Sequence, residues 1–124
     1  MARLLIAVDG SPPSLRALEF GASLAAKLGV GVLLLHVMPQ GGMAAEGTRL
    51  LAALEDKAHS HGVAVETELG EGDAAATLSG RSEAADIQLV VMGSRGQGAV
   101  ARLLLGSVAT QVVHTATKPV VVVR

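Results

Sequence analysis

The hydrophobic positions of the chain gather into five short runs, separated by stretches that contain turn residues. The runs are RLLIAV at 3–8, GVLLLHV at 31–37, VAVETEL at 63–69, IQLVVM at 87–92 and PVVVV at 119–123. Short apolar runs that are rich in branched side chains predict buried strands. The third run alternates apolar side chains with Glu66 and Glu68, which predicts a strand at an edge of the sheet.

The stretches between these runs carry apolar residues at helical spacing and predict four helices. Ser11 followed by two prolines is typical of a helix start, and Gly29 is well placed to end that first helix. We expect a second helix over about 43–60 and a third that Asp73 caps. The fourth helix runs to about Thr115.

Strands that alternate with helices of crossover length predict an α/β fold. We expect an open, five-stranded parallel sheet with helices on both faces. The 124 residues suit one domain, which we expect to span 1–124. No apolar run approaches the roughly 20 residues that cross a membrane, and the first ten residues lack a secretory cleavage pattern. These features predict a cytoplasmic protein without a membrane partner.

Composition excludes several classes of function. The chain has no cysteine, which removes disulfides, thiolate catalysis and thiolate metal sites. Its formal net charge is −1 and it contains no basic block, which argues against a nucleic-acid partner. Phe20 is the one aromatic residue, so the stacking platforms of single-strand binders are also missing.

The candidate chemistry lies in GSRGQGAVARLLLGS, residues 93–107. Gly93 and Gly96 follow the fourth strand at its carboxyl end, where open parallel sheets bind ligands. Without a Cβ, these glycines would let bare N–H groups approach an anion such as phosphate. Gly106 would be unfavourable inside a helix, so we expect the fourth helix to begin near it. Ser107 would then lie at a helix N-terminus, a favourable place for phosphate.

Less specific interpretations of the same residues remain open. Gly93 and Gly96 are also compatible with an ordinary turn after a strand, and Asp9 with a cap for the turn into the first helix. His36 lies in an apolar strand, which favours a hydrogen-bonded position in the core or at the rim of a pocket. If Gly106 borders bound phosphate, Gly106→Val should abolish binding and leave the fold intact. We expect residues 97–105 to form a loop or short turn over the site.

Two segments resemble the universal stress protein family. The pattern Gly93-x2-Gly96-x9-Gly106-Ser107 resembles its ATP-binding signature, and VVMGSRGQGAVARLLLGSVATQVVHTATKPVVVVR is similar to its carboxyl-terminal third almost position by position. The segment LLIAVDGSPPSLRAL resembles the family's opening strand and turn. The four-point spacing makes the resemblance specific, although residues 38–62 are shorter than the family's usual connection.

The resemblance implies a Rossmann-like fold of the adenine nucleotide alpha hydrolase-like type, with strand order 3-2-1-4-5. It implies ATP, ADP or AMP as ligand, with Mg²⁺ held through the nucleotide and near Asp9. The nucleotide-binding positions implied are Val8 and Asp9 for the adenosine pocket, Val37 for the adenine edge, Met92 and Gly93 for the ribose, and Gly96, Gly106, Ser107 and Val108 for the phosphates. Arg95 is a further candidate, as a source of positive charge.

The function implied is that of a nucleotide-binding sensor or regulator in the stress response. The chain lacks a P-loop lysine and an evident general base, which argues against fast turnover and leaves slow ATP hydrolysis open. The alternative is an adenine-nucleotide-hydrolysing enzyme of the same architecture, for which Asp9 and Arg95 are the candidate catalytic groups. The resemblance also implies a homodimer that pairs the final strands, Val120 to Val123.

Overall fold

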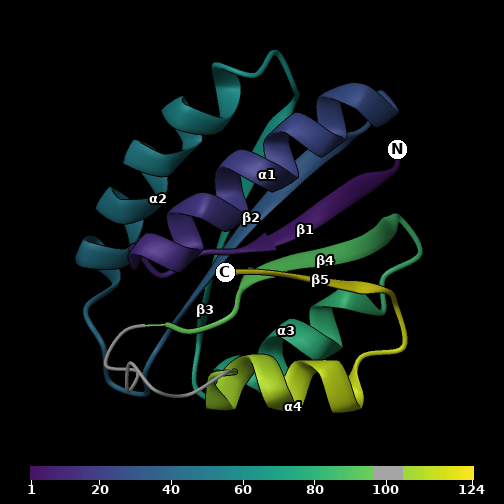
Figure 1. The fold of residues 1–124 in the computed structure, drawn as a ribbon. Helices are drawn as coiled ribbons and strands as arrows, with labels where there is room; N and C mark the ends of the chain where they lie inside the picture. The colour runs from purple at the N-terminus through teal and green to yellow at the C-terminus, as the bar shows by residue number, and fades with distance from the viewer. Residues whose placement is uncertain (97–104) are drawn as a thin grey trace.

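In a computed structural model, which describes residues 1–96 and 105–124, strands and helices alternate along the chain (Figure 1). The elements in order are β1 (Arg3–Ala7), α1 (Pro12–Leu28), β2 (Gly31–Met38), α2 (Ala44–His59), β3 (Val65–Glu71), α3 (Ala74–Ser82), β4 (Ile87–Gly93), α4 (Ser107–Thr115) and β5 (Val120–Val123). None of the helices in these two ranges is long and apolar enough to cross a membrane.

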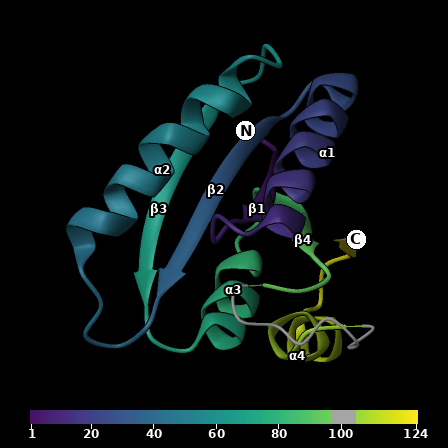
Figure 2. The ribbon, with the colours of Figure 1, turned by 60° about the vertical axis from the view of Figure 1, so that its left-hand side comes forward.

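The five strands form one parallel sheet in the order β3-β2-β1-β4-β5. Leu5 of the central strand β1 pairs with Leu33 of β2 on one side and with Val90 of β4 on the other. Helices α1 and α2 cover one face of the sheet, and α3 and α4 cover the other (Figures 1 and 2). The predicted fold class and strand order are therefore confirmed, as is the edge position of β3.

Each face of the sheet buries its own apolar cluster. Leu4 and Ile6 of β1 point toward α1 and α2, whereas Leu5 points toward α3 and α4, and all three are fully buried. Because successive side chains of a strand alternate between faces, a strand covered on both faces needs apolar residues at every position. Burying a leucine contributes about 1.5–3 kcal/mol. This explains why β1, β2 and β4 appear in the sequence as mostly apolar runs.

The helix ends follow the predicted capping chemistry. Ser11 caps α1 by accepting a hydrogen bond from the Ser14 amide, and Gly29 ends the helix with φ +70°, which favours glycine. Asp73 caps α3 by accepting from the Ala76 amide at 2.9 Å. Helix α4 begins at Ser107, directly after Gly106, as expected. The loop predicted over the site falls mostly on residues 97–104, outside the described ranges.

The third strand starts and ends two residues later than the predicted 63–69. The predicted strand end at residue 69 is wrong, because Gly70 pairs with Val37 and continues the ladder of β3 on β2. A Cβ on Gly70 would lie 3.1 Å from the Thr77 methyl carbon, so its missing side chain makes room for α3. The chain turns two residues after Gly70, at Gly72, where φ is +112°.

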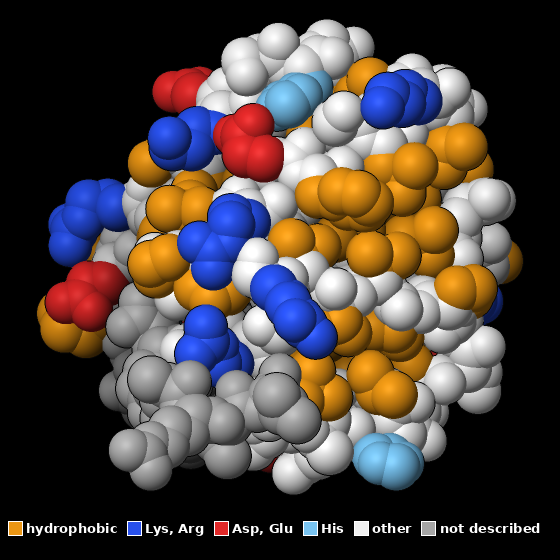
Figure 3. Space-filling view, viewed as in Figure 1, with side chains coloured by type: hydrophobic (Ala, Val, Ile, Leu, Met, Phe, Trp, Pro, Cys, Tyr) orange, Lys and Arg blue, Asp and Glu red, His pale blue; other side chains and the backbone are white. Residues whose placement is uncertain are grey.

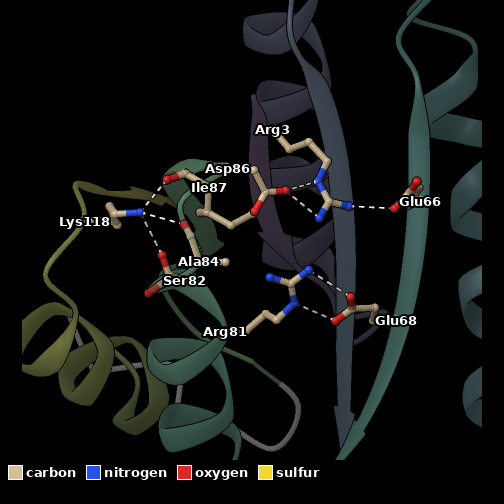
Figure 4. A network of polar contacts seen from close by, with 9 residues as sticks. All are labelled: Arg3, Glu66, Glu68, Arg81, Ser82, Ala84, Asp86, Ile87 and Lys118. Carbon is tan, nitrogen blue, oxygen red and sulfur yellow. Dashed lines mark hydrogen bonds and ion pairs between the residues drawn. The ribbon is translucent and has the colours of Figure 1, made fainter. Parts of the chain in front are cut away.

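Charged side chains bridge β2 on the face that α3 and α4 cover (Figure 4). Arg3 contacts Glu66 at 2.8 Å and Asp86 at 2.7 Å. Arg81 donates two hydrogen bonds to Glu68, at 2.9 and 3.0 Å. The hydrogen bond from Arg81 holds the pKa of Glu68 below its ordinary value, despite partial burial. These contacts account for the two acidic residues that alternate along β3.

Lys118, which lies just before β5, makes its hydrogen bonds to main-chain carbonyls. Its Nζ donates hydrogen bonds to the carbonyl oxygens of Ser82, Ala84 and Ile87, at 3.1, 3.0 and 2.6 Å (Figure 4). A lysine ammonium has three protons to donate, so this arrangement can use all of them. Lys118 thereby ties the approach to β5 to the connection between α3 and β4.

Candidate functional site

A cavity of about 460 Å³ opens where β1, β2 and β4 end and α4 begins. Because the strands are parallel, their carboxyl ends meet at one edge of the sheet, which Figure 2 shows for β2 and β3. The order β3-β2-β1-β4-β5 reverses direction between β1 and β4. Open α/β sheets bind their ligands at such a reversal point.

All ten residues predicted for the site line this cavity. They are Val8, Asp9, Val37, Met92, Gly93, Arg95, Gly96, Gly106, Ser107 and Val108. The positions come from four separated segments of the chain, and the fold brings them to one place. Their individual roles toward a ligand remain predictions.

Eight further residues line the cavity and were not predicted for the site: Ala7, Ser14, Leu35, His36, Pro39, Ala74, Leu78 and Ala109. Ala7 and His36 directly precede predicted positions, and Leu35 lies one residue further back, so the strand ends could have indicated them. Ala74 and Leu78 come from α3, a helix without any polar motif that faces the site. In the sequence they are ordinary helix residues, and only the packing of α3 places them there.

The turn after β1 is held by hydrogen bonds from three directions. The Asp9 amide donates to Ser14 Oγ at 2.9 Å, and the Val8 carbonyl lies 2.8 Å from His36 Nδ1. Asp9 Oδ1 accepts from both the amide and the hydroxyl of Ser11. The interpretation of Asp9 as a cap for the turn is therefore confirmed. Its second carboxylate oxygen, Oδ2, faces Gly96 across the site.

Gly93 and Gly96 make room for protein atoms. A Cβ on Gly93 would lie 2.8 Å from the carbonyl carbon of Pro13, so this glycine lets the end of β4 touch the first turn of α1. A Cβ on Gly96 would lie 2.6 Å from Asp9 Oδ2. Neither glycine has a positive φ. Their lack of a Cβ is therefore required for packing between segments, in addition to any approach of a ligand.

Gly106 joins α4 to the end of β4. Its amide donates to the Ser94 carbonyl at 2.6 Å, and a Cβ would lie 3.2 Å from Arg95 Cα and 3.3 Å from that same carbonyl oxygen. The space that a side chain would need is thus partly taken by main chain. The expectation that Gly106→Val would leave the fold intact is corrected: the larger side chain should also destabilise the junction.

Helix α4 presents its first amides to the cavity. The bond from the Thr110 amide to the Gly106 carbonyl, at 2.9 Å, belongs to the first turn. The amides of Ser107, Val108 and Ala109 precede it and have no partner within the helix. All three residues line the cavity. Such a group of amides, with the helix dipole behind it, attracts an anion.

The remainder of the wall is mostly apolar. Leu35, Leu78 and Met92 are nearly completely buried around the cavity, and Val37 is partly buried beside them. Asp9 is the one acidic residue among the described lining residues, and Arg95 is the basic one. No group of three potential metal-binding side chains occurs within residues 1–96 and 105–124. The arrangement suits a ligand with an apolar ring at one end and an anionic group at the other.

Comparison with known proteins places this chain among one family of sequences. The family model described as "Universal stress protein family" matches residues 1–124. Universal stress protein YxiE of Bacillus subtilis is 28% identical in an alignment 145 positions long, which covers 98% of each chain. Universal stress protein MJ0531 of Methanocaldococcus jannaschii is 31% identical in an alignment 138 positions long, which covers 98% of this chain and 81% of its own. A 65-residue match to a universal stress protein of Mycolicibacterium smegmatis is 48% identical and spans about a fifth (21%) of that relative.

Solved structures of the family share the fold. UspA from Lactobacillus plantarum superposes with a TM-score of 0.90 at 20% identity, over 99% of this chain and 97% of its own. The universal stress protein from Archaeoglobus fulgidus in complex with dAMP has a TM-score of 0.83 at 26% identity, over 100% and 98% of the two chains. A universal stress protein in complex with cAMP has a TM-score of 0.82 at 23% identity, over 99% and 97%.

Proposed function

Because the chain belongs to the universal stress protein family, we propose that its cavity binds an adenine nucleotide. In this proposal the bound nucleotide sets a regulatory state in the stress response and does not feed a fast catalytic cycle. The observation that carries the proposal is the convergence of all ten predicted binding residues on one cavity of about 460 Å³. That volume lies within the range of roughly 300–1,000 Å³ typical of small-molecule sites.

The two ends of the cavity suit the two ends of a nucleotide. The apolar wall around Leu35, Val37 and Met92 would accept the adenine ring, with the Val37 main chain available for its polar edge. The amides at the start of α4 would bind phosphate. The relative from Archaeoglobus fulgidus binds dAMP, which supports an adenosine-type ligand here.

In this proposal Asp9 contacts the middle of the nucleotide, either a ribose hydroxyl or a magnesium ion that arrives with the phosphates. Mg²⁺ commonly uses one or two carboxylates together with phosphate oxygens and waters. A single carboxylate therefore fits a metal that is bound with the nucleotide. It does not fit a metal held by the protein alone, in agreement with the absence of a three-ligand group in the described ranges.

The proposal is tested first on the protein as purified. Denaturation followed by chromatography and mass spectrometry would identify any nucleotide that the protein retains. Calorimetric titration of the emptied protein with ATP and Mg²⁺, AMP, dAMP and cAMP would rank the ligands. Absence of bound nucleotide together with absence of binding heat for all four would refute the proposal.

A charge placed at the start of α4 tests the phosphate end. Ser107→Asp adds a carboxylate where phosphate would bind, and the helix dipole tolerates a negative charge at that position. We expect affinity for ATP to fall about tenfold or more through charge repulsion. The matched control is Gln111→Glu, which adds the same charge at an exposed position one turn later on α4, outside the cavity lining. Equal affinities for the two variants would contradict the placement of the phosphates.

We also infer that two copies pair through β5. This strand lies at the end of the sheet order, opposite β3. Figure 3 shows apolar side chains gathered on the side where Figure 1 places α1 and β5. An apolar edge strand of this kind invites pairing with another strand. An antiparallel pairing of two β5 strands would join the two sheets into one.

The geometry of β5 supplies a selective variant for this inference. The Pro119 and Val123 carbonyls accept hydrogen bonds from the amides of Val90 in β4 and of Ser94 directly after it, so the alternate residues Val120 and Val122 direct their main chain to the open edge. Val122→Pro removes a donor there and preserves the bonds to β4. We expect it to convert a dimer to a monomer in analytical ultracentrifugation, whereas Val122→Thr stays dimeric. A monomeric parent protein, or a proline variant that stays dimeric, would refute the pairing.

A further inference from the structure

The peptide unit between Val8 and Asp9 is held at both of its polar atoms by side chains from other elements. Its carbonyl oxygen, on Val8, lies 2.8 Å from Nδ1 of His36 in β2. Its amide, on Asp9, donates to Oγ of Ser14 in α1 at 2.9 Å. Rotation of this peptide unit would break both hydrogen bonds. The direction in which Asp9 leaves the main chain is therefore fixed from two sides.

The Val8 carbonyl also determines the tautomer of His36. A carbonyl oxygen can only accept, so Nδ1 carries the proton and donates it. The ring lies beside α2, where a Cβ on Gly47 would be 3.4 Å from His36 Cδ2, an ordinary contact distance. Nδ1 is therefore the ring atom that holds the Val8 carbonyl.

We propose that His36 is a positioning residue for ligand binding, which acts by holding the Val8–Asp9 peptide so that the Asp9 carboxylate stays directed to the site. This inference rests on the proposed nucleotide function and deepens it, because it assigns a role to a cavity residue outside the predicted set. Asp9 Oδ1 is engaged by Ser11, so a small rotation of the main chain would displace both carboxylate oxygens. His36 controls that rotation from a neighbouring strand.

Two substitutions of His36 distinguish the effect of its Nδ1 donor on binding from the effect of the other ring atoms. An asparagine amide can replace the Nδ1 donor, whereas a glutamine amide reaches the position of Nε2. We expect His36→Gln to weaken Mg-ATP binding about fivefold, the value of one ordinary hydrogen bond. His36→Asn should recover affinity to within about twofold of the parent protein. Both are measured by calorimetry at pH 8. Equal losses in the two variants would overturn the proposal.

A double-mutant cycle shows whether His36 acts through Asp9. Asp9→Asn keeps an acceptor oxygen for Ser11 and removes the charge. In that background His36→Gln should cost little further affinity, because the group that it positions no longer functions. An undiminished fivefold loss in the Asp9→Asn background would overturn the proposal.

One measurement needs no variant. Nitrogen-15 NMR of the histidine rings at pH 8 distinguishes the two neutral tautomers, and we expect Nδ1–H for His36. The Nε2–H tautomer would overturn the proposal even if His36→Gln failed to fold. Failure of the parent protein to bind any adenine nucleotide would instead refute the proposed function. The two failures are therefore distinguishable.

Discussion

Gly96→Ala tests how strictly the site depends on the contact between Gly96 and Asp9. The added Cβ would lie 2.6 Å from Asp9 Oδ2, whereas ordinary contacts begin near 3.4 Å. One of the two groups must therefore move by about 0.8 Å. The carboxylate is the end of a flexible side chain, so it should yield at small cost to the fold. Its hydrogen bonds with Ser11 should weaken as it turns.

Gly93→Ala is the matched comparison, because its added Cβ meets main chain. The Cβ would lie 2.8 Å from the Pro13 carbonyl carbon and 3.0 Å from its oxygen. Neither atom can turn aside without moving α1 away from β4. Overpacking of this kind costs about 1–3 kcal/mol. We therefore expect Gly93→Ala to lower the free energy of unfolding by about 2 kcal/mol, and Gly96→Ala to lower it by less than about 1 kcal/mol.

Ligand affinity should separate the two variants in addition to stability. Gly96→Ala displaces Asp9, so we expect a loss of about tenfold in Mg-ATP affinity, equal to about 1.4 kcal/mol and comparable to one charge-assisted hydrogen bond. Urea unfolding gives the stabilities, and calorimetric titration of the folded variants gives the affinities. Parental affinity in Gly96→Ala, or a larger stability loss there than in Gly93→Ala, would refute this reasoning.

Two further predictions concern the charged face of the sheet. The pKa of Glu68 is lowered by its hydrogen bond from Arg81, so the pair stabilises the fold above the ordinary carboxyl pKa of 4.5, and this stabilisation is lost as the pH falls below that value. Urea unfolding from pH 7 to pH 3 should therefore show a shallower pH dependence in Arg81→Met than in the parent protein, and parallel curves would contradict it. Lys118→Met leaves three carbonyls without their ammonium donor and should cost about 2–3 kcal/mol in urea unfolding, with Lys27→Met, at an exposed position on α1, as the control expected to change little.

The sequence predicts most of this fold because local and global signals agree. Residues that begin and end helices are found where the sequence places them, including Ser11, Gly29 and Asp73. The start of α4 is also predictable, since Gly106 is unfavourable inside a helix. The end of β3 is not, because its continuation through Gly70 depends on pairing with β2 and on the packing of Thr77.

The residues of the candidate site also differ in whether a local sequence pattern predicts them. Residues in motifs, such as Asp9 and Ser107, are predicted and do line the cavity. Ala74 and Leu78 are not predicted, since α3 carries no motif and contributes only shape. The hydrogen bond between His36 and the Val8 carbonyl is also beyond the sequence, although a hydrogen-bonded position at a pocket rim is what the isolated polar residue in β2 predicted. Contacts between segments distant in the chain leave no local pattern.

The glycines of the motif are poorer positions than Ser107 for testing where phosphate binds. Gly93 and Gly106 each lie where two segments of main chain meet, at α1 and at the end of β4. Substituting them disturbs the fold and the site together, so loss of binding in such variants would not show where the phosphates lie. The start of α4 offers a cleaner test, because Ser107 is exposed at the first position of the helix. A ligand that depends on this helix end must respond to a charge there while the fold does not.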